Sequence, residues 1–72
     1  MDMHPVKSSN VDAVGYDPAS RKMHIRFKNG GTYCYHDVPQ DKHAALIAAP
    51  SVGSFVHQNI RGIHKHSKVE AA

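Results

Sequence analysis

The sequence lacks the features that mark disulfide-linked, zinc-stapled or membrane-spanning proteins. Its 72 residues include one cysteine and no tryptophan. Because Cys34 has no second cysteine to pair with, an internal disulfide is excluded and a reducing compartment is the natural environment. No stretch approaches the roughly 18 consecutive apolar residues of a membrane span, and no apolar run follows Met1 to Pro5 as it would in a signal peptide. We therefore expect a soluble, cytoplasmic protein.

The length fits one small domain. A chain of this size buries about 60% of its unfolded surface, so its stability is marginal without a covalent or metal staple. After His64 the sequence has no periodicity and little apolar content. These observations predict a single domain over residues 1–64 and a flexible basic tail over residues 65–72.

Positive charge exceeds negative charge by a modest margin. Nine Lys and Arg residues against six Asp and Glu residues give a net charge of +3, and protonation of all seven histidines would raise it to +10. This charge favours polyanions or an acidic patch on a partner protein, but it is small for a dedicated nucleic-acid-binding protein. A solvated basic surface explains it equally well, so composition leaves the partner open.

The segment from Lys22 to His36 has the pattern of a β-hairpin. Its first half alternates apolar with basic residues, in the order Met23, His24, Ile25, Arg26, Phe27 and Lys28. Its second half alternates Tyr33 and Tyr35 with smaller or polar residues. Period-two alternation in both halves predicts two antiparallel strands. Between them, Asn29, Gly30 and Gly31 provide the positive φ angles of a tight turn, with Asn29-Gly30 favouring type I′.

A third strand is predicted ahead of the hairpin, over Val11 to Tyr16. Gly15 within it suggests a bulge or a close backbone approach, and Asp17-Pro18 begins the turn into the hairpin. The expected sheet is a three-stranded antiparallel meander with Val11 to Tyr16 and Thr32 to His36 as its two edges.

Two short helices are predicted after the hairpin. Gln40 to Ala49 is rich in alanine, with Asp37 as a possible cap before it and Pro50 ending it. Ser51 is a good N-cap for a second helix, whose apolar or core-facing positions recur at three and four: Val52, Phe55, Val56, Asn59, Ile60 and Ile63. Because the apolar face of the sheet needs a cover, we predict an α+β fold in which both helices pack on one face of the meander (βββαα, two layers). Ile25, Phe27 and Phe55 are assigned to its core.

No residue pattern in the chain is typical of an enzyme or a metal site. The histidine pairs worth considering are His64 with His66 and His24 with His36, but no further ligands accompany them at zinc-site spacing. Cys34 could act as a nucleophile with a histidine as its base, although a strand position between two tyrosines more often holds a packed thiol. We therefore expect no enzymatic activity, no cofactor and no specific metal.

Two surfaces are candidates for a partner. The basic row of the hairpin can meet phosphates or an acidic peptide, and Tyr33 or Tyr35 can stack on a base if solvent reaches them. The lead-in His4 to Asn10 and the edge strands can accept an extended peptide. The partner-binding residues predicted on these surfaces are His4, Val6, Lys7, Ser8, Asn10, His24, Arg26 and Lys28, and Arg61 is predicted as a further cation for phosphate contact.

Several short motifs together resemble one known family. They are Pro5 to Asn10, Val14 to Asp17, the YxY motif Tyr33-Cys34-Tyr35, Val38-Pro39, Ser51 to Phe55 and Ile60-Arg61. Over about residues 5 to 64 the chain resembles the KTSC domain, a short module named after the C-terminus of some lysyl-tRNA synthetases and also found alone in bacterial and phage proteins. Lys42, His43 and His64 depart from the pattern, since apolar or aromatic residues are usual there.

The resemblance implies two functions from different classes. The free-standing chain is similar to small phage-encoded proteins of this family, among them a transcription regulator, so we expect a monomer that binds host bacterial RNA polymerase in the host cytoplasm and inhibits initiation. The alternative is an RNA-binding module of the lysyl-tRNA synthetase C-terminal type, since RNA binding has been suggested for the family.

Overall fold

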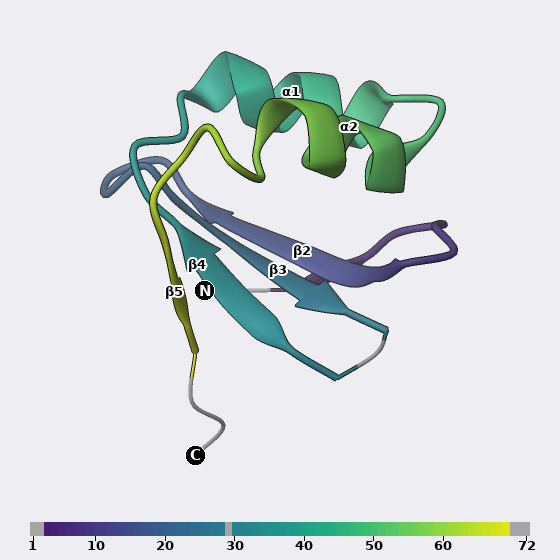
Figure 1. Cartoon of the computed structure of the whole chain (residues 1–72). Coiled ribbons are helices and arrows are strands. Elements are labelled where there is room, and N and C mark those ends of the chain that lie inside the picture. The colour runs from purple at the N-terminus through teal and green to yellow at the C-terminus, as the bar shows by residue number, and fades with distance from the viewer. Residues whose placement is uncertain (1–2, 29, 70–72) are drawn as a thin grey trace.

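A five-stranded antiparallel sheet carries two helices on one of its faces (Figure 1). The computed structural model describes residues 3–28 and 30–69. The elements in chain order are β1 (His4–Pro5), β2 (Val11–Asp17), β3 (Lys22–Phe27), β4 (Thr32–Tyr35), α1 (Gln40–Ala48), α2 (Val52–Asn59) and β5 (His66–Lys68). The strands lie in the sheet in the order β1-β2-β3-β4-β5.

The expected α+β class with two helices is confirmed, but the sheet has five strands and not three. In the lead-in, His4 pairs opposite Val14 to form β1, and after α2 Ser67 pairs opposite Cys34 to form β5. The prediction that β2 and β4 are the edges is therefore wrong, because both lie inside the sheet. The two added strands have two and three residues without an apolar row, so no pattern in the sequence indicated them.

Part of the segment expected to be a flexible tail is a strand. The chain leaves α2 and returns along the outer edge of β4 (Figure 1). The pairing extends beyond β5 at both ends, because the N–H of His36 donates to the Lys65 carbonyl and the N–H of Val69 donates to the Thr32 carbonyl, both at 2.8 Å. An unpaired strand edge offers a row of backbone donors and acceptors, and this edge is satisfied by the chain's own C-terminal segment. Residues 70–72 lie outside the described residues.

β3 and β4 form the predicted hairpin. Met23 lies opposite Tyr35 and Ile25 opposite Tyr33, so the apolar row of β3 and the tyrosine row of β4 share one face. At the turn, Gly30 has a φ of 111°, which favours glycine, and the N–H of Phe27 donates to the Gly31 carbonyl at 2.8 Å. Asn29, the other half of the predicted turn motif, lies outside the described residues.

A bulge in β2 corrects the predicted alternation of that strand. Val11 lies opposite Phe27 but Ala13 opposite Arg26, so Asp12 is an extra residue in the ladder. A bulge shifts the faces on which neighbouring side chains lie, and here it places both Val11 and Val14 in the core. Gly15, where a bulge seemed possible, pairs regularly.

The core lies between the sheet and the helices. It consists of the buried side chains Val11, Val14, Met23, Ile25, Tyr35, Val38, Leu46, Val52, Val56 and Ile60. Ile25 is buried as predicted, whereas Phe27 and Phe55 pack against this cluster and are partly buried. Ile63, predicted on the apolar face of the second helix, is 60% exposed. The reason is that α2 ends at Asn59 and Gly62, with a φ of 80°, turns the chain away.

The helix ends agree with the sequence in part. The Ser51 hydroxyl accepts a hydrogen bond from the Ser54 N–H and caps α2 as predicted. Pro39, and not Asp37, is the N-cap residue of α1, and no side chain of the described residues caps this helix. Among the described residues no helix is long and apolar enough to cross a lipid bilayer.

We expect the core to respond to truncation very differently from the exposed isoleucine. Ile25→Ala removes a fully buried side chain and should lower the free energy of unfolding by about 2–5 kcal/mol. The matched control Ile63→Ala removes a side chain that is 60% exposed and should change it by less than about 0.5 kcal/mol. Urea unfolding followed by circular dichroism measures both. Similar losses for the two variants would contradict this assignment of the core.

Candidate nucleic-acid interface

The basic row predicted on the hairpin is divided between two sides of the molecule. Met23 and Ile25 face the helices, so His24 and Arg26 face the other way, because successive strand residues alternate. The Nε of Arg26 donates to Oδ2 of Asp12 at 2.8 Å, and about half of each side chain is exposed. This pairing offsets part of the positive charge on that face. Lys28 follows the end of β3 and lines a pocket beside α2.

The predicted lead-in residues are also separated. His4, Val6 and Lys7 line a cavity of about 590 Å³ next to α1. Ser8 has a structural role, because its Oγ accepts hydrogen bonds from the N–H groups of Asn10 and Val11 at 3.2 Å. The same oxygen would lie 3.2 Å from a Cβ on Gly53, so the lead-in packs closely on the first turn of α2.

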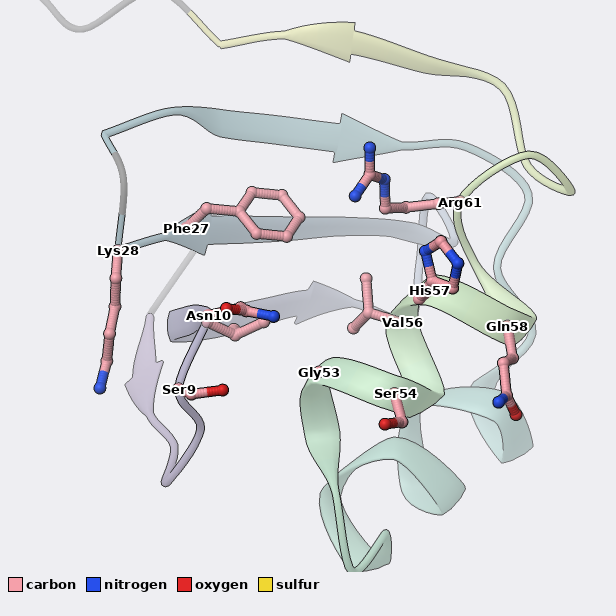
Figure 2. A pocket seen from close by; sticks show the side chains of 11 residues that line it. Ser9, Asn10, Phe27, Lys28, Gly53, Ser54, Val56, His57, Gln58 and Arg61 are labelled. Atoms are coloured by element: carbon pink, nitrogen blue, oxygen red, sulfur yellow. The ribbon is translucent and has the colours of Figure 1, made fainter.

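The remaining predicted residues meet at two adjoining pockets of about 710 Å³ each, which share Phe27, His57 and Arg61. Figure 2 shows the first pocket, with Phe27 on β3, Lys28 at one end and Arg61 with His57 at the other. The second pocket continues past the hairpin turn to β5. We call the two together the basic aromatic cleft; its principal residues are Asn10, Phe27, Lys28, Tyr33, His57, Arg61, His66 and Lys68.

A row of rings forms the side of the cleft that belongs to the sheet. The ring centroids of Phe27 and Tyr33 are 5.8 Å apart, as are those of Tyr33 and His66, and both pairs meet edge to face. The rings share the helix side of the sheet because Tyr33 and Tyr35 alternate with the opposite-facing Cys34, and His66 lies opposite Tyr35. The ring of Tyr33 also packs on Gly31, where an added Cβ would come within 2.8 Å of it.

The cleft is basic. Lys28, Arg61 and Lys68 are exposed and line it together with His57 and His66, and none of the described lining residues is Asp or Glu. Side chains of one charge around a concave surface raise the local concentration of ions of the opposite sign. The arrangement can therefore hold a phosphate-bearing ligand whose planar groups contact the rings.

The geometry around Cys34 does not favour nucleophilic chemistry. Its thiol is buried on the face away from the helices, opposite His24 in the register of β3 and β4. Burial raises the pKa of the Cys34 thiol and lowers the pKa of His24. Both shifts favour the neutral forms, whereas a reactive cysteine needs a stabilised thiolate.

The histidine pairs considered for a metal also have other contacts. His64 Nδ1 lies 3.1 Å from the His36 carbonyl, and the ring of His66 packs against Tyr33 and Tyr35. Within residues 3–28 and 30–69, no group of three or more His, Cys, Asp or Glu side chains is placed to hold a metal ion.

Sequence reasoning found part of this cleft. Asn10, Lys28 and Arg61 were among the predicted residues, and Tyr33 was a stacking candidate on the condition of exposure. His66 and Lys68 were missed because the sequence predicts a flexible tail there, and His57 was missed because a lone histidine on a helix has no distinguishing pattern. From His64 to Lys68 every residue is polar, so no alternation of apolar and polar side chains could have indicated a strand there.

Comparison with a family model and comparison with solved structures identify the same domain. A family model described as the KTSC domain matches residues 7–64. A protein of Tsukamurella paurometabola is 47% identical over 55 residues, which make up 76% of this chain and 82% of that protein. A lysine–tRNA ligase of Nostoc is 30% identical over 63 residues, which make up 88% of this chain and 11% of the ligase. The crystal structure of a KTSC domain protein from Yersinia pestis matches with a TM-score of 0.94 and 36% identity, covering 96% of this chain and 97% of that one.

Proposed function

The chain belongs to the KTSC domain family, and from this premise we propose that it is a non-enzymatic module that binds single-stranded RNA in the basic aromatic cleft. One observation carries the proposal: partly exposed rings and exposed cations line the same concave surface. Rings provide surfaces on which unstacked bases stack, and Lys and Arg side chains pair with the phosphates between them. In a duplex the bases already stack on one another, so a single strand fits this surface better.

Two observations support RNA as the strand. A segment of a lysine–tRNA ligase, an enzyme whose name specifies an RNA substrate, is related to most of this chain. The cleft is also lined by small polar groups, among them Ser9, Asn10, Ser54 and Gln58. Such groups can exchange hydrogen bonds with the ribose 2′-hydroxyl, which distinguishes RNA from DNA.

The proposal includes the absence of catalysis. Binding by stacking and charge needs no cofactor, and the buried Cys34 is held in its unreactive form by the raised pKa of its thiol. A cytoplasmic location, expected from the single cysteine, is part of the same proposal, since RNA is available there.

The second candidate is the function first expected from the resemblance, a regulator that binds host bacterial RNA polymerase and inhibits initiation. It was expected to use the lead-in, the sheet edges and the basic row of the hairpin, but β2 and β4 are interior, and the outer strands β1 and β5 have only two and three residues, with Pro5 in β1. Proline lacks the N–H that would pair with an added strand. The alternative would therefore use side-chain contacts, for which the cavity lined by His4, Val6 and Lys7 is available.

Charge and ring variants test RNA binding against a control on the opposite face. Arg61→Gln and Lys68→Gln should each reduce the slope of log affinity against log salt by about 0.7, starting from about −2 for three contacting cations. Tyr33→Ala should weaken binding by about 1–3 kcal/mol, whereas Tyr33→Phe keeps the ring and most of the affinity. Fluorescence anisotropy with a labelled oligouridylate of about ten nucleotides measures both quantities.

Lys22→Gln is the matched control. It removes the same charge from an exposed position at the start of β3, on the face away from the helices. Its affinity and salt slope should equal those of the wild type. If Lys22→Gln weakens binding as much as Arg61→Gln does, or if a duplex binds as tightly as the single strand, the cleft is not a single-strand site.

The two candidate functions also predict different results with RNA polymerase in a bacterial lysate. An RNA-binding module should lose its association with bacterial RNA polymerase after ribonuclease treatment, because any association would pass through transcripts. A polymerase regulator should retain stoichiometric binding after that treatment and at raised salt, since backbone and apolar contacts are weakly screened. Size-exclusion chromatography of the treated mixture distinguishes them.

A further inference from the structure

β5 is a short strand whose attachment determines the shape of the cleft. It has three residues, all exposed, and it contributes His66 and Lys68 to the cleft. A three-residue edge strand has few contacts of its own. The contacts that hold β5 in place therefore help to determine the shape of the cleft.

Its attachment point is a junction around His64. Lys42 Nζ, from α1, donates to the Asn59 carbonyl at the end of α2 at 3.0 Å and lies 2.8 Å from His64 Nε2. On the other side of the ring, His64 Nδ1 lies 3.1 Å from the His36 carbonyl, just after β4. The next residue, Lys65, accepts the His36 N–H at 2.8 Å and begins the pairing of β4 with β5.

These contacts fix the protonation state of His64 at neutral pH. An ammonium group has donors and no acceptor, so the Nε2 that faces Lys42 must accept, and the proton lies on Nδ1, which donates to the His36 carbonyl. Protonation of Nε2 would direct a second N–H, on a positively charged ring, at the ammonium group 2.8 Å away. The hydrogen bond would become a repulsion.

On balance, the surroundings of the His64 ring favour its neutral form. Burial and Lys42 lower the pKa of His64, while the hydrogen bond to the His36 carbonyl and the charge of Asp37 oppose them. The contribution of α2 to this junction is the neutral carbonyl of Asn59, to which Lys42 donates. Because the folded-state pKa is lowered, the folded chain binds fewer protons than the unfolded chain. The stabilisation is complete above the ordinary value of 6.5 and is lost as the pH falls below it.

We propose that His64 is a positioning residue that fixes β5 against the helices at neutral pH and releases it on acidification, which opens one wall of the basic aromatic cleft. The release of β5 is argued only from the contacts of His64 with Lys42 and with the His36 carbonyl. Its effect on a ligand rests on the proposed RNA-binding function.

Amide hydrogen exchange measures the release directly. The N–H groups of His36 and Val69 report on β5, because their acceptors are the Lys65 and Thr32 carbonyls, and the N–H of Lys28, which donates to Asn10, reports on the β2 side of the sheet. Between about pH 7.5 and about pH 5.5, after correction for intrinsic exchange, protection at His36 and Val69 should fall about tenfold for each pKa unit by which binding of the strand lowers the value of His64. Protection at Lys28 should fall less.

Two variants separate His64 from the other histidines. His64→Gln retains an acceptor for Lys42 and a donor for the His36 carbonyl but does not titrate, so β5 protection should become independent of pH. His64→Phe removes both hydrogen bonds, so protection should be low at both pH values. In the wild type, the midpoint of the loss should coincide with the titration of His64.

Three results would overturn the proposal: an equal loss of β5 protection in His64→Gln, a midpoint that follows another histidine, or a parallel loss at Lys28. The last would mean global destabilisation, to which His24 and His43 contribute since burial lowers the pKa of each. Fluorescence anisotropy with the oligouridylate at both pH values tests RNA binding separately from the release of β5. If the strand is released but no RNA binds at either pH, the proposed function fails and the positioning role of His64 stands.

Discussion

Two helices of nine and eight residues must bury one face of a five-stranded sheet, and the rest of the structure depends on how far that cover reaches. The cover is complete over Val14 of β2, Ile25 of β3 and Tyr35 of β4, each of which has 2% exposed surface or less. It ends toward the hairpin turn and β5, where Phe27 and Tyr33 are partly buried and His66 is exposed. The same face of the sheet is therefore a hydrophobic core at one end and an aromatic wall open to solvent at the other. The basic aromatic cleft is the consequence of this incomplete cover.

The sequence predicted the parts of the fold that local patterns determine. Alternation in β3 and β4, the capping serine Ser51 and the alanine-rich α1 were sufficient for the hairpin, both helices and the α+β class. It did not predict β1 and β5, because strands of two and three residues form only when a distant edge supplies their hydrogen bonds. It also did not predict that Asp12 forms a bulge, since the bulge depends on pairing with β3 and not on composition.

In the candidate site, too, local patterns indicated some residues, whereas others join the site only through pairing between distant segments. Arg26 and Lys28 looked equivalent in the basic row, yet Arg26 is paired with Asp12 on the far face, and Lys28 leaves the strand and reaches the cleft. Arg61 was found because it is a cation near a recognisable motif, whereas His66 and Lys68 join the cleft through the pairing of β5 with β4. The residues that extend the cleft most thus depend on the strand that is held through His64, so ligand binding and the attachment of β5 are parts of one physical system.

The most direct test of this account is an NMR titration of the ¹⁵N-labelled chain with a single-stranded oligouridylate, because it locates the contact surface without any substitution. The account predicts that amide shifts concentrate at Gly31, Tyr33, Arg61 and Lys68, while the amides of His24 and Lys22 stay unchanged. Shifts that centre on the face of His24 and Arg26, or on the cavity beside His4, would contradict the assignment of the basic aromatic cleft as the site.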